Sequence, residues 1–257
     1  MLMIKNKKNI PIIKKYIFIY FLIIGTQFIS YFCLTKLIVF LYYSGKQNNS
    51  NLSLIGFINN NNIQLQKILN LGFCDENGKF PDHDYLKYLI YIYLGIIYYW
   101  YLVLPYFFYQ YLDKKQKKQL YDLFIKTLII SYIIFIILPI KSPETNIISS
   151  LEFPKQPNIR NNLTNNLLNF TYQIDNDRVC SCPSLHVLFT YISFVIFRSN
   201  SKIPKSIIYG QLILTILVWV STFALKQHFI IDGIISTILT EIVFILSSKK
   251  TKNKITN

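Results

Sequence analysis

The stretch that decides the fold is CSCPSLHVLFTYISFVIF, residues 180–197. It opens with polar residues, a proline and a histidine, and then continues as an apolar run. A titratable side chain inside or beside a membrane-crossing helix is rare and is a functional candidate by default. The stretch therefore raises two questions: whether this run crosses a membrane, and what chemistry needs a histidine at its start.

The apolar residues of the chain are gathered into long runs. Hydrophobic residues make up 52% of the 257 residues, which is too apolar for an ordinary soluble domain. A helix needs about 20 residues to cross a bilayer. Six runs approach or exceed this length: 16–43, 88–111, 123–140, 183–197, 207–225 and 228–247. A soluble protein with six buried helices is the alternative, but the runs lack the polar face of soluble helices. The sequence thus predicts a single membrane domain over 1–257, an all-α polytopic bundle of six transmembrane helices.

The basic residues predict how these helices are oriented. They form four clusters beside the apolar runs, and six crossings place all four clusters on one side. The clusters are Lys5, Lys7, Lys8, Lys14 and Lys15; Lys114, Lys115, Lys117 and Lys118; Arg198, Lys202 and Lys205; and Lys249, Lys250, Lys252 and Lys254. Segments 44–87 and 141–182 each carry four basic and four acidic residues. By the positive-inside rule, both termini and the loop 113–118 are cytoplasmic, and 44–87 and 141–182 are outer loops. We therefore attribute the net charge of +15 to the basic clusters that orient the helices in the membrane, and we expect no binding of nucleic acid.

The cysteines and acidic residues give no metal signature. Cys33 lies in the first apolar run, whereas Cys74, Cys180 and Cys182 lie in predicted outer segments, where a disulfide is possible. The CSC sequence lacks the ligand spacing of zinc sites. No cluster of carboxylates that could hold magnesium stands near His186 and His228 in the sequence. We therefore expect neither a metal nor another cofactor.

The first candidate site is PSLH, residues 183–186, at the start of the fourth apolar run. Proline suits the first turn of a helix, where its missing N–H costs nothing. The free N–H groups of such a helix end bind anions, above all phosphate. Ser184 adds a hydroxyl donor, and His186 can give or take a proton. The alternative is a capping serine and a histidine that reaches the membrane interface.

The second candidate site is KQHFIID, residues 226–232. His228 and Asp232 are four residues apart and share one face of a helix. A carboxylate on one imidazole nitrogen leaves the other nitrogen free as a nucleophile or base. Lys226 supplies a cation beside them, although a purely structural hydrogen bond is the alternative for the pair.

The third candidate site is LPIKSPE, residues 138–144, where Lys141 either neutralises phosphate or is an ordinary snorkelling lysine. The three regions lie at the same predicted membrane face. They supply two histidines, a carboxylate, a helix N-terminus and two cations. This set predicts phosphoryl transfer through a phosphohistidine, with one histidine attacking and the other protonating the leaving oxygen.

With these motifs in place, the chain resembles the type 2 phosphatidic acid phosphatase superfamily. CPSLH (182–186) is similar to its PSGH-type motif, with Leu185 in place of Gly. STFALKQHFIID (221–232) is similar to its motif of Ser, Arg, five residues, His, three residues and Asp. Thr222 stands in place of the Arg. The resemblance extends over a catalytic core of about 138–247.

The resemblance implies a role for each matched residue. His228 is expected to be the nucleophile, Asp232 its orienting partner and His186 the general acid. The residues expected to bind the substrate phosphate are Ser184, Leu185, Lys226, Lys141 and Ser221.

The implied activity is hydrolysis of a membrane lipid phosphate by a multi-pass protein, at its extracytoplasmic or lumenal face. The PSLH motif looks more like the inositol phosphorylceramide synthase branch and its bacterial relatives, so transfer of a sphingolipid-type headgroup is the alternative. An inactive scaffold and a transporter are the non-enzyme alternatives. A transporter would need polar residues through the middle of its helices, and these are scarce here.

Overall fold

The computed structural model describes residues 25, 29–31, 33–38, 40, 88–140, 163–174, 181–225 and 227–253. All the regular elements of this part of the chain are helical, which confirms the all-α prediction. The elements are α3 (Leu89–Tyr98), the π-helical turn η4 (Tyr99–Val103), α4 (Leu104–Tyr111), α5 (Lys114–Ile137), α7 (Leu163–Ile174), α8 (Leu185–Arg198), α9 (Lys205–Ala224) and α10 (Ile230–Asn253). The predicted loop 44–87 and most of the first run lie outside the described residues.

Three described helices are long and apolar enough to cross a membrane: α5, α9 and the Ile230–Ser248 part of α10. The predicted second span, 88–111, is divided among α3, η4 and α4. The backbone stays helical at both junctions, Tyr99 and Leu104, so these three elements form one helix with a single π turn. Helix α8 has 14 residues, a length of about 21 Å, which is shorter than a hydrocarbon core of about 30 Å. The count of six spans stays a prediction.

The outward faces of the long helices are apolar. Large exposed hydrophobic residues recur every three or four positions: Ile125, Ile129, Ile133, Ile136 and Ile137 on α5; Tyr209, Ile213, Ile216 and Leu217 on α9; and Ile234, Ile238, Ile242, Ile245 and Leu246 on α10. The inward faces carry small hydroxyl residues that donate to carbonyls of their own helices: Thr127, Ser131, Thr190, Ser193, Thr215, Ser221, Thr222, Ser236 and Thr240. Small residues inside and bulky apolar residues outside are typical of helices that pack within lipid.

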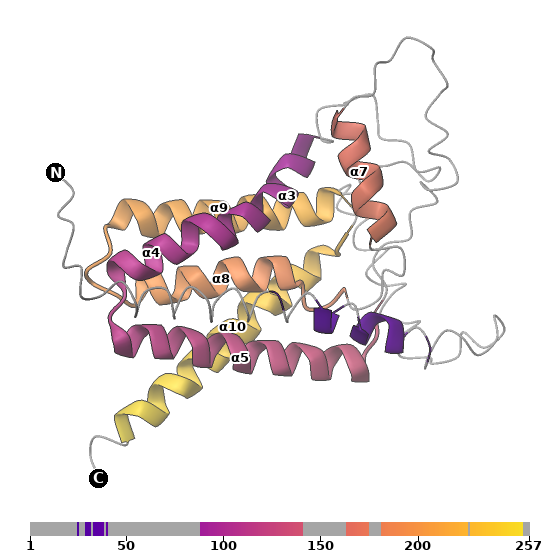
Figure 1. Cartoon of the computed structure of the whole chain (residues 1–257). Helices are drawn as coiled ribbons and strands as arrows, with labels where there is room; N and C mark the ends of the chain where they lie inside the picture. The colour runs from indigo at the N-terminus through magenta and orange to yellow at the C-terminus, as the bar shows by residue number, and fades with distance from the viewer. Residues whose placement is uncertain are drawn as a thin grey trace, which may run out of the picture.

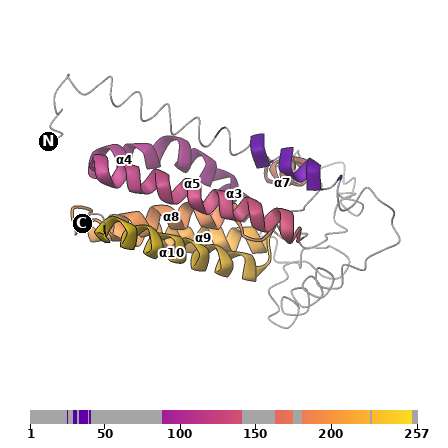
Figure 2. The same cartoon turned by 90° about the horizontal axis from the view of Figure 1, so that it is seen from below.

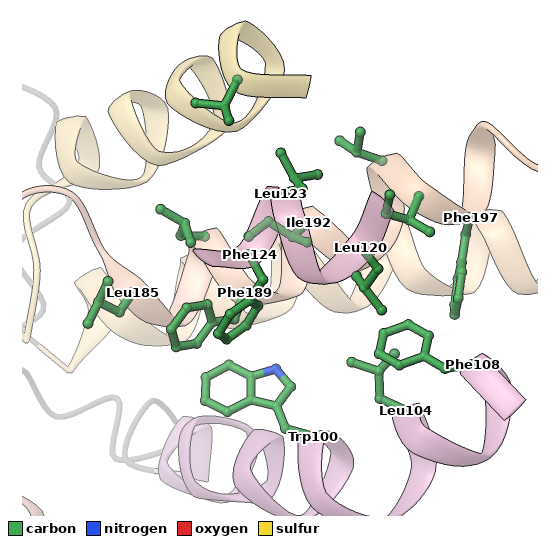
Figure 3. Packing of buried hydrophobic residues seen from close by; sticks show 14 of the residues in the cluster. Trp100, Leu104, Phe108, Leu120, Leu123, Phe124, Leu185, Phe189, Ile192 and Phe197 are labelled. Atoms are coloured by element: carbon green, nitrogen blue, oxygen red, sulfur yellow. The ribbon is translucent and has the colours of Figure 1, made fainter. Parts of the chain in front are cut away.

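Helix α8 is the central helix of the bundle. It is buried along most of its length and lies among α5, α9 and α10, with α3 and α4 on a further side (Figures 1 and 2). Phe189 joins it to two neighbouring elements. Its ring stacks on Phe124 of α5, with centroids 4.6 Å apart, and meets the edge of Trp100 from η4 at 5.5 Å (Figure 3). The shortest of the predicted spans is therefore the one most enclosed by protein.

One end of the bundle carries the described basic clusters. The turn between α8 and α9 contacts the turn between α4 and α5, because the Asn200 amide donates to the Tyr111 carbonyl and to Gln116 Oε1. The prediction of a loop over 113–118 is wrong. Asp113 accepts a hydrogen bond from the Gln116 N–H, and Gln116 accepts one in return, so a capping box starts α5 at Lys114. The lysines of this cluster form the first turns of α5.

The opposite end holds His186 and His228. Here the Ser181 N–H donates to the Ile140 carbonyl at 3.1 Å, and Ile140 packs with Cys182 and Phe229. The end of α5, the start of α8 and the start of α10 therefore meet at this end. Helix α7 lies in segment 141–182, which the sequence predicts to be an outer loop. It is held to α3 by a hydrogen bond of 2.9 Å between the hydroxyls of Thr164 and Tyr91.

Gly233 is fixed by the close packing of α10 against α9. A Cβ at this position would overlap the Trp219 indole, whose N–H donates to the Ile230 carbonyl. Gly210 of α9 offers a matched control, because a Cβ there would meet nothing within 4 Å. We expect Gly233→Ala to destabilise the protein by about 1–3 kcal/mol through overpacking, and Gly210→Ala to stabilise it by about 0.4–1 kcal/mol.

Thermal unfolding of the detergent-purified variants measures this difference. A Tm of Gly233→Ala at or above that of Gly210→Ala would contradict the described packing of α9 and α10.

Candidate active site

His228 lies in the short turn between α9 and α10. The Thr222 carbonyl accepts the backbone N–H groups of both Gln227 and His228, at 3.0 and 3.2 Å, so the chain turns back immediately after α9. The side chain of His228 is only 10% exposed. A polar ring this well enclosed needs hydrogen-bond partners that fix its orientation.

One ring nitrogen of His228 is bound by a backbone carbonyl. Its Nδ1 lies 2.8 Å from the carbonyl oxygen of Ser181. A carbonyl only accepts hydrogen bonds, so Nδ1 carries a proton, and in the neutral ring Nε2 keeps its lone pair. The Ser181 carbonyl is itself held in place, because the N–H of Ser181 donates to Ile140. The turn before α8 therefore presents Nε2 of His228 as a nucleophile or base.

Asp232 lies near the same nitrogen but at a greater distance. Its Oδ2 is 3.6 Å from Nδ1 of His228, which is beyond hydrogen-bond distance. The same oxygen accepts the Phe229 N–H at 2.8 Å, in the manner of a third-position carboxylate at a helix start. The orienting role expected of Asp232 stays a prediction, because its oxygen lies within ion-pair distance of Nδ1, whereas the hydrogen bond of Nδ1 is accepted by the Ser181 carbonyl. Sequence reasoning missed Ser181 because the acting atom belongs to the backbone, which leaves no signal in residue type.

His186 is the second residue of α8 and faces His228. The centroids of the two imidazole rings are 6.0 Å apart. The ring of His186 stacks on Tyr93 of α3 at 4.5 Å and lies 5.8 Å from Trp100 of η4. These aromatic neighbours also escaped the sequence analysis, because 20 tyrosines and 20 phenylalanines make no single aromatic residue stand out. The structure thus brings the two predicted histidines together and supports one of them with aromatic rings.

Ser184 and Leu185 form the start of α8. Ser184 is the N-cap residue, but its side chain makes no capping hydrogen bond, and its buried Oγ has no partner among the described residues. Its carbonyl lies 3.0 Å from the hydroxyl of Ser236, which donates to the Asp232 carbonyl of its own helix at 2.7 Å, so one hydrogen is shared between α8 and α10. The side chain of Leu185 packs in the hydrophobic core, so Leu185 can offer a ligand only its backbone.

Of the remaining predicted phosphate-binding residues, the structure describes Ser221 only. The hydroxyl of Ser221 donates to the Val218 carbonyl at 2.7 Å, and that of Thr222 to the Trp219 carbonyl at 2.7 Å. Neither hydroxyl has a hydrogen left for a ligand. Lys141 and Lys226 lie outside the described residues.

Cys182, beside the site, is a free and buried thiol and takes part in no disulfide. Burial, and then the negative charge of nearby Asp232, raise the pKa of this thiol. The thiol therefore stays protonated beside the carboxylate.

Buried polar atoms without partners gather around the two histidines. In the part of the chain that the structure describes, they belong to Trp100, Ser181, Ser184, Gln227 and Asp232. Each of these residues contacts one of the histidines, precedes it within two positions or shares its turn. An unsatisfied buried polar atom costs about 1–3 kcal/mol, so such a concentration makes this the candidate place for water or a polar ligand to bind.

Comparison with known families bears directly on this arrangement. A model of the PAP2 superfamily matches residues 69–246, a range that includes both histidines, Ser181 and Asp232. No curated protein and no solved structure matches the chain. The matched range is well over half of the 257 residues and contains the motifs singled out in the sequence. The chain belongs to the PAP2 superfamily.

Proposed function

We propose that the protein is a membrane-embedded lipid phosphate phosphatase or phosphotransferase that acts through a phosphohistidine on His228. Membership of the PAP2 superfamily supports phosphatase-type chemistry on lipid phosphates in a membrane. The observation that carries the proposal is the hydrogen bond from Nδ1 of His228 to the Ser181 carbonyl, opposite the ring of His186. In the neutral ring it leaves Nε2 of His228 unprotonated, and the ring of His186 lies 6.0 Å away between centroids.

In the first step, Nε2 of His228 attacks the phosphorus of the substrate. The bond between phosphorus and the leaving oxygen breaks, and His186 gives its proton to that oxygen. Positive charge builds on the His228 ring as the nitrogen–phosphorus bond forms. The Ser181 carbonyl, and the Asp232 carboxylate at 3.6 Å, stabilise this charge.

In the second step, a water molecule attacks the phosphohistidine. The nitrogen–phosphorus bond breaks and its electrons return to Nε2 of His228, while His186 takes the proton of the attacking water. Phosphate leaves. A lipid hydroxyl in place of water completes transfer of the phospho-headgroup, which is the sphingolipid-type alternative.

The phosphate is held by the start of α8. Ser184 offers a hydroxyl that has no hydrogen-bond partner among the described residues. The free N–H groups of the first turn of α8 and the positive end of its helix dipole are at the same place and favour an anion. We keep Lys141 and Lys226 as proposed cations for the phosphate. Their sequence neighbours Ile140 and Gln227 are described, and both lie at the end of the bundle that holds His186 and His228.

We further propose that the site opens to the outer face of the membrane. The described clusters at 114–118 and 198–205 lie at the end of the bundle opposite the histidines. Clusters of lysine and arginine favour the cytoplasmic side.

The two histidines should respond differently to the leaving group. We expect His228→Ala to abolish turnover of every substrate, because the nucleophile is gone. His186→Ala should slow breakdown of a lipid phosphate by about 10²–10⁴-fold, the usual contribution of a general acid. It should slow breakdown of nitrophenyl phosphate far less, because that leaving group needs no proton. Steady-state rates of the purified variants measure this, and equal losses on both substrates in His186→Ala would contradict the assignment.

Accessibility labelling tests the orientation. Lys115 is exposed at the start of α5, and Gln173 is exposed on α7. In a background with all four native cysteines replaced, we expect an impermeant maleimide to label Gln173→Cys in intact cells. Lys115→Cys should react only after permeabilisation, because its cluster stays on the cytoplasmic side. Labelling of Lys115→Cys in intact cells would reverse the proposed orientation.

A further inference from the structure

Gln227 has a buried side chain whose polar atoms are not used by the protein. It directly precedes His228 and is 2% exposed. Its backbone N–H is satisfied by the Thr222 carbonyl. Its side-chain Nε2 and Oε1, in contrast, are both buried and have no hydrogen-bond partner among the described residues. A donor and an acceptor are therefore available beside the proposed nucleophile.

A second buried glutamine of the same bundle shows what a structural amide looks like here. Gln211 of α9 is 3% exposed. Its Oε1 accepts the hydroxyl of Tyr99, and its Nε2 donates to the Thr190 carbonyl at 2.9 Å. Both ends of this amide are used to join α9 to η4 and α8. Buried amides are normally satisfied in this way, so the unpartnered amide of Gln227 needs an explanation.

We propose that Gln227 binds the substrate at the transferred phosphoryl group. Its Nε2–H donates to a phosphoryl oxygen held at His228. The hydroxyls of Ser221 and Thr222, near the end of α9, have already given their hydrogens to helix carbonyls. Its Oε1 cannot accept from an ionised phosphoryl oxygen, but it suits the hydroxyl group of the water or alcohol that attacks in the second step. This inference rests on the proposed function and adds a neutral contact to it.

Vanadate, a phosphate analogue, provides a direct probe of this contact. Methionine is close to glutamine in size and lacks the polar atoms. Gln227→Met removes two unsatisfied buried atoms, so we expect its Tm to equal or exceed that of the wild type. It also removes a charge-assisted hydrogen bond to the anion, so inhibition by vanadate should weaken by about tenfold or more.

Gln211→Met is the matched control, and we expect the opposite pattern. Loss of this amide leaves the Tyr99 hydroxyl and the Thr190 carbonyl without their partner, so the Tm should fall. Inhibition by vanadate should stay within about twofold of the wild type, because Gln211 lies between helices and away from His228. Both variants are compared as full-length protein in detergent.

Vanadate inhibition and Tm together test whether Gln227 binds the phosphoryl group. Weaker vanadate inhibition with an unreduced Tm in Gln227→Met supports the inference. Unchanged vanadate inhibition in Gln227→Met, or a Tm that falls as in Gln211→Met, overturns it and makes Gln227 a structural residue. A wild-type protein that does not respond to vanadate contradicts the proposed function itself, and the inference fails with it.

Discussion

The hydrogen bond between Nδ1 of His228 and the Ser181 carbonyl is the interaction on which the candidate site depends. It joins three parts of the chain that are far apart in sequence, because Ser181 is also held by the Ile140 carbonyl at the end of α5. The bond sets the tautomer of the ring, and the tautomer sets which nitrogen can attack. Without it, two histidines would still face each other, but neither would have a defined donor and acceptor nitrogen.

The membrane explains why the site lies at the end of the bundle. Within lipid, every backbone polar group must be satisfied, and helices achieve this along their length but not at their ends. Hydroxyl residues in the middle of the bundle, such as Thr127 and Ser131, use their hydrogens on carbonyls of their own helix. Free polar capacity therefore remains where α8 and α10 begin. Ser184, at the start of α8, keeps an unsatisfied hydroxyl beside the two histidines.

The sequence alone predicted much of this arrangement, and its failures have physical causes. Long apolar runs predicted the helices, and the PSLH and HFIID motifs identified both histidines, because these signals depend on residue type and spacing. The start of α5 was misjudged, since a capping box at Asp113 extends that helix into the lysine cluster. The role of Ser181 could not be predicted, because a backbone carbonyl has no residue signature. The unsatisfied amide of Gln227 could not be predicted either, because residue type does not show which hydrogen bonds a glutamine makes. Gln211 is the same residue type, and both ends of its amide are bonded.

The central claim is that Ser181 fixes the proton on Nδ1 of His228 and leaves Nε2 as the nucleophile. The phosphorylated enzyme tests it most directly. The protein is quenched in alkali during turnover of a labelled lipid phosphate, and the phosphorylated residue and its ring nitrogen are identified. We expect phosphate on Nε2 of His228. Phosphate on Nδ1 of His228, or on His186, would contradict the account.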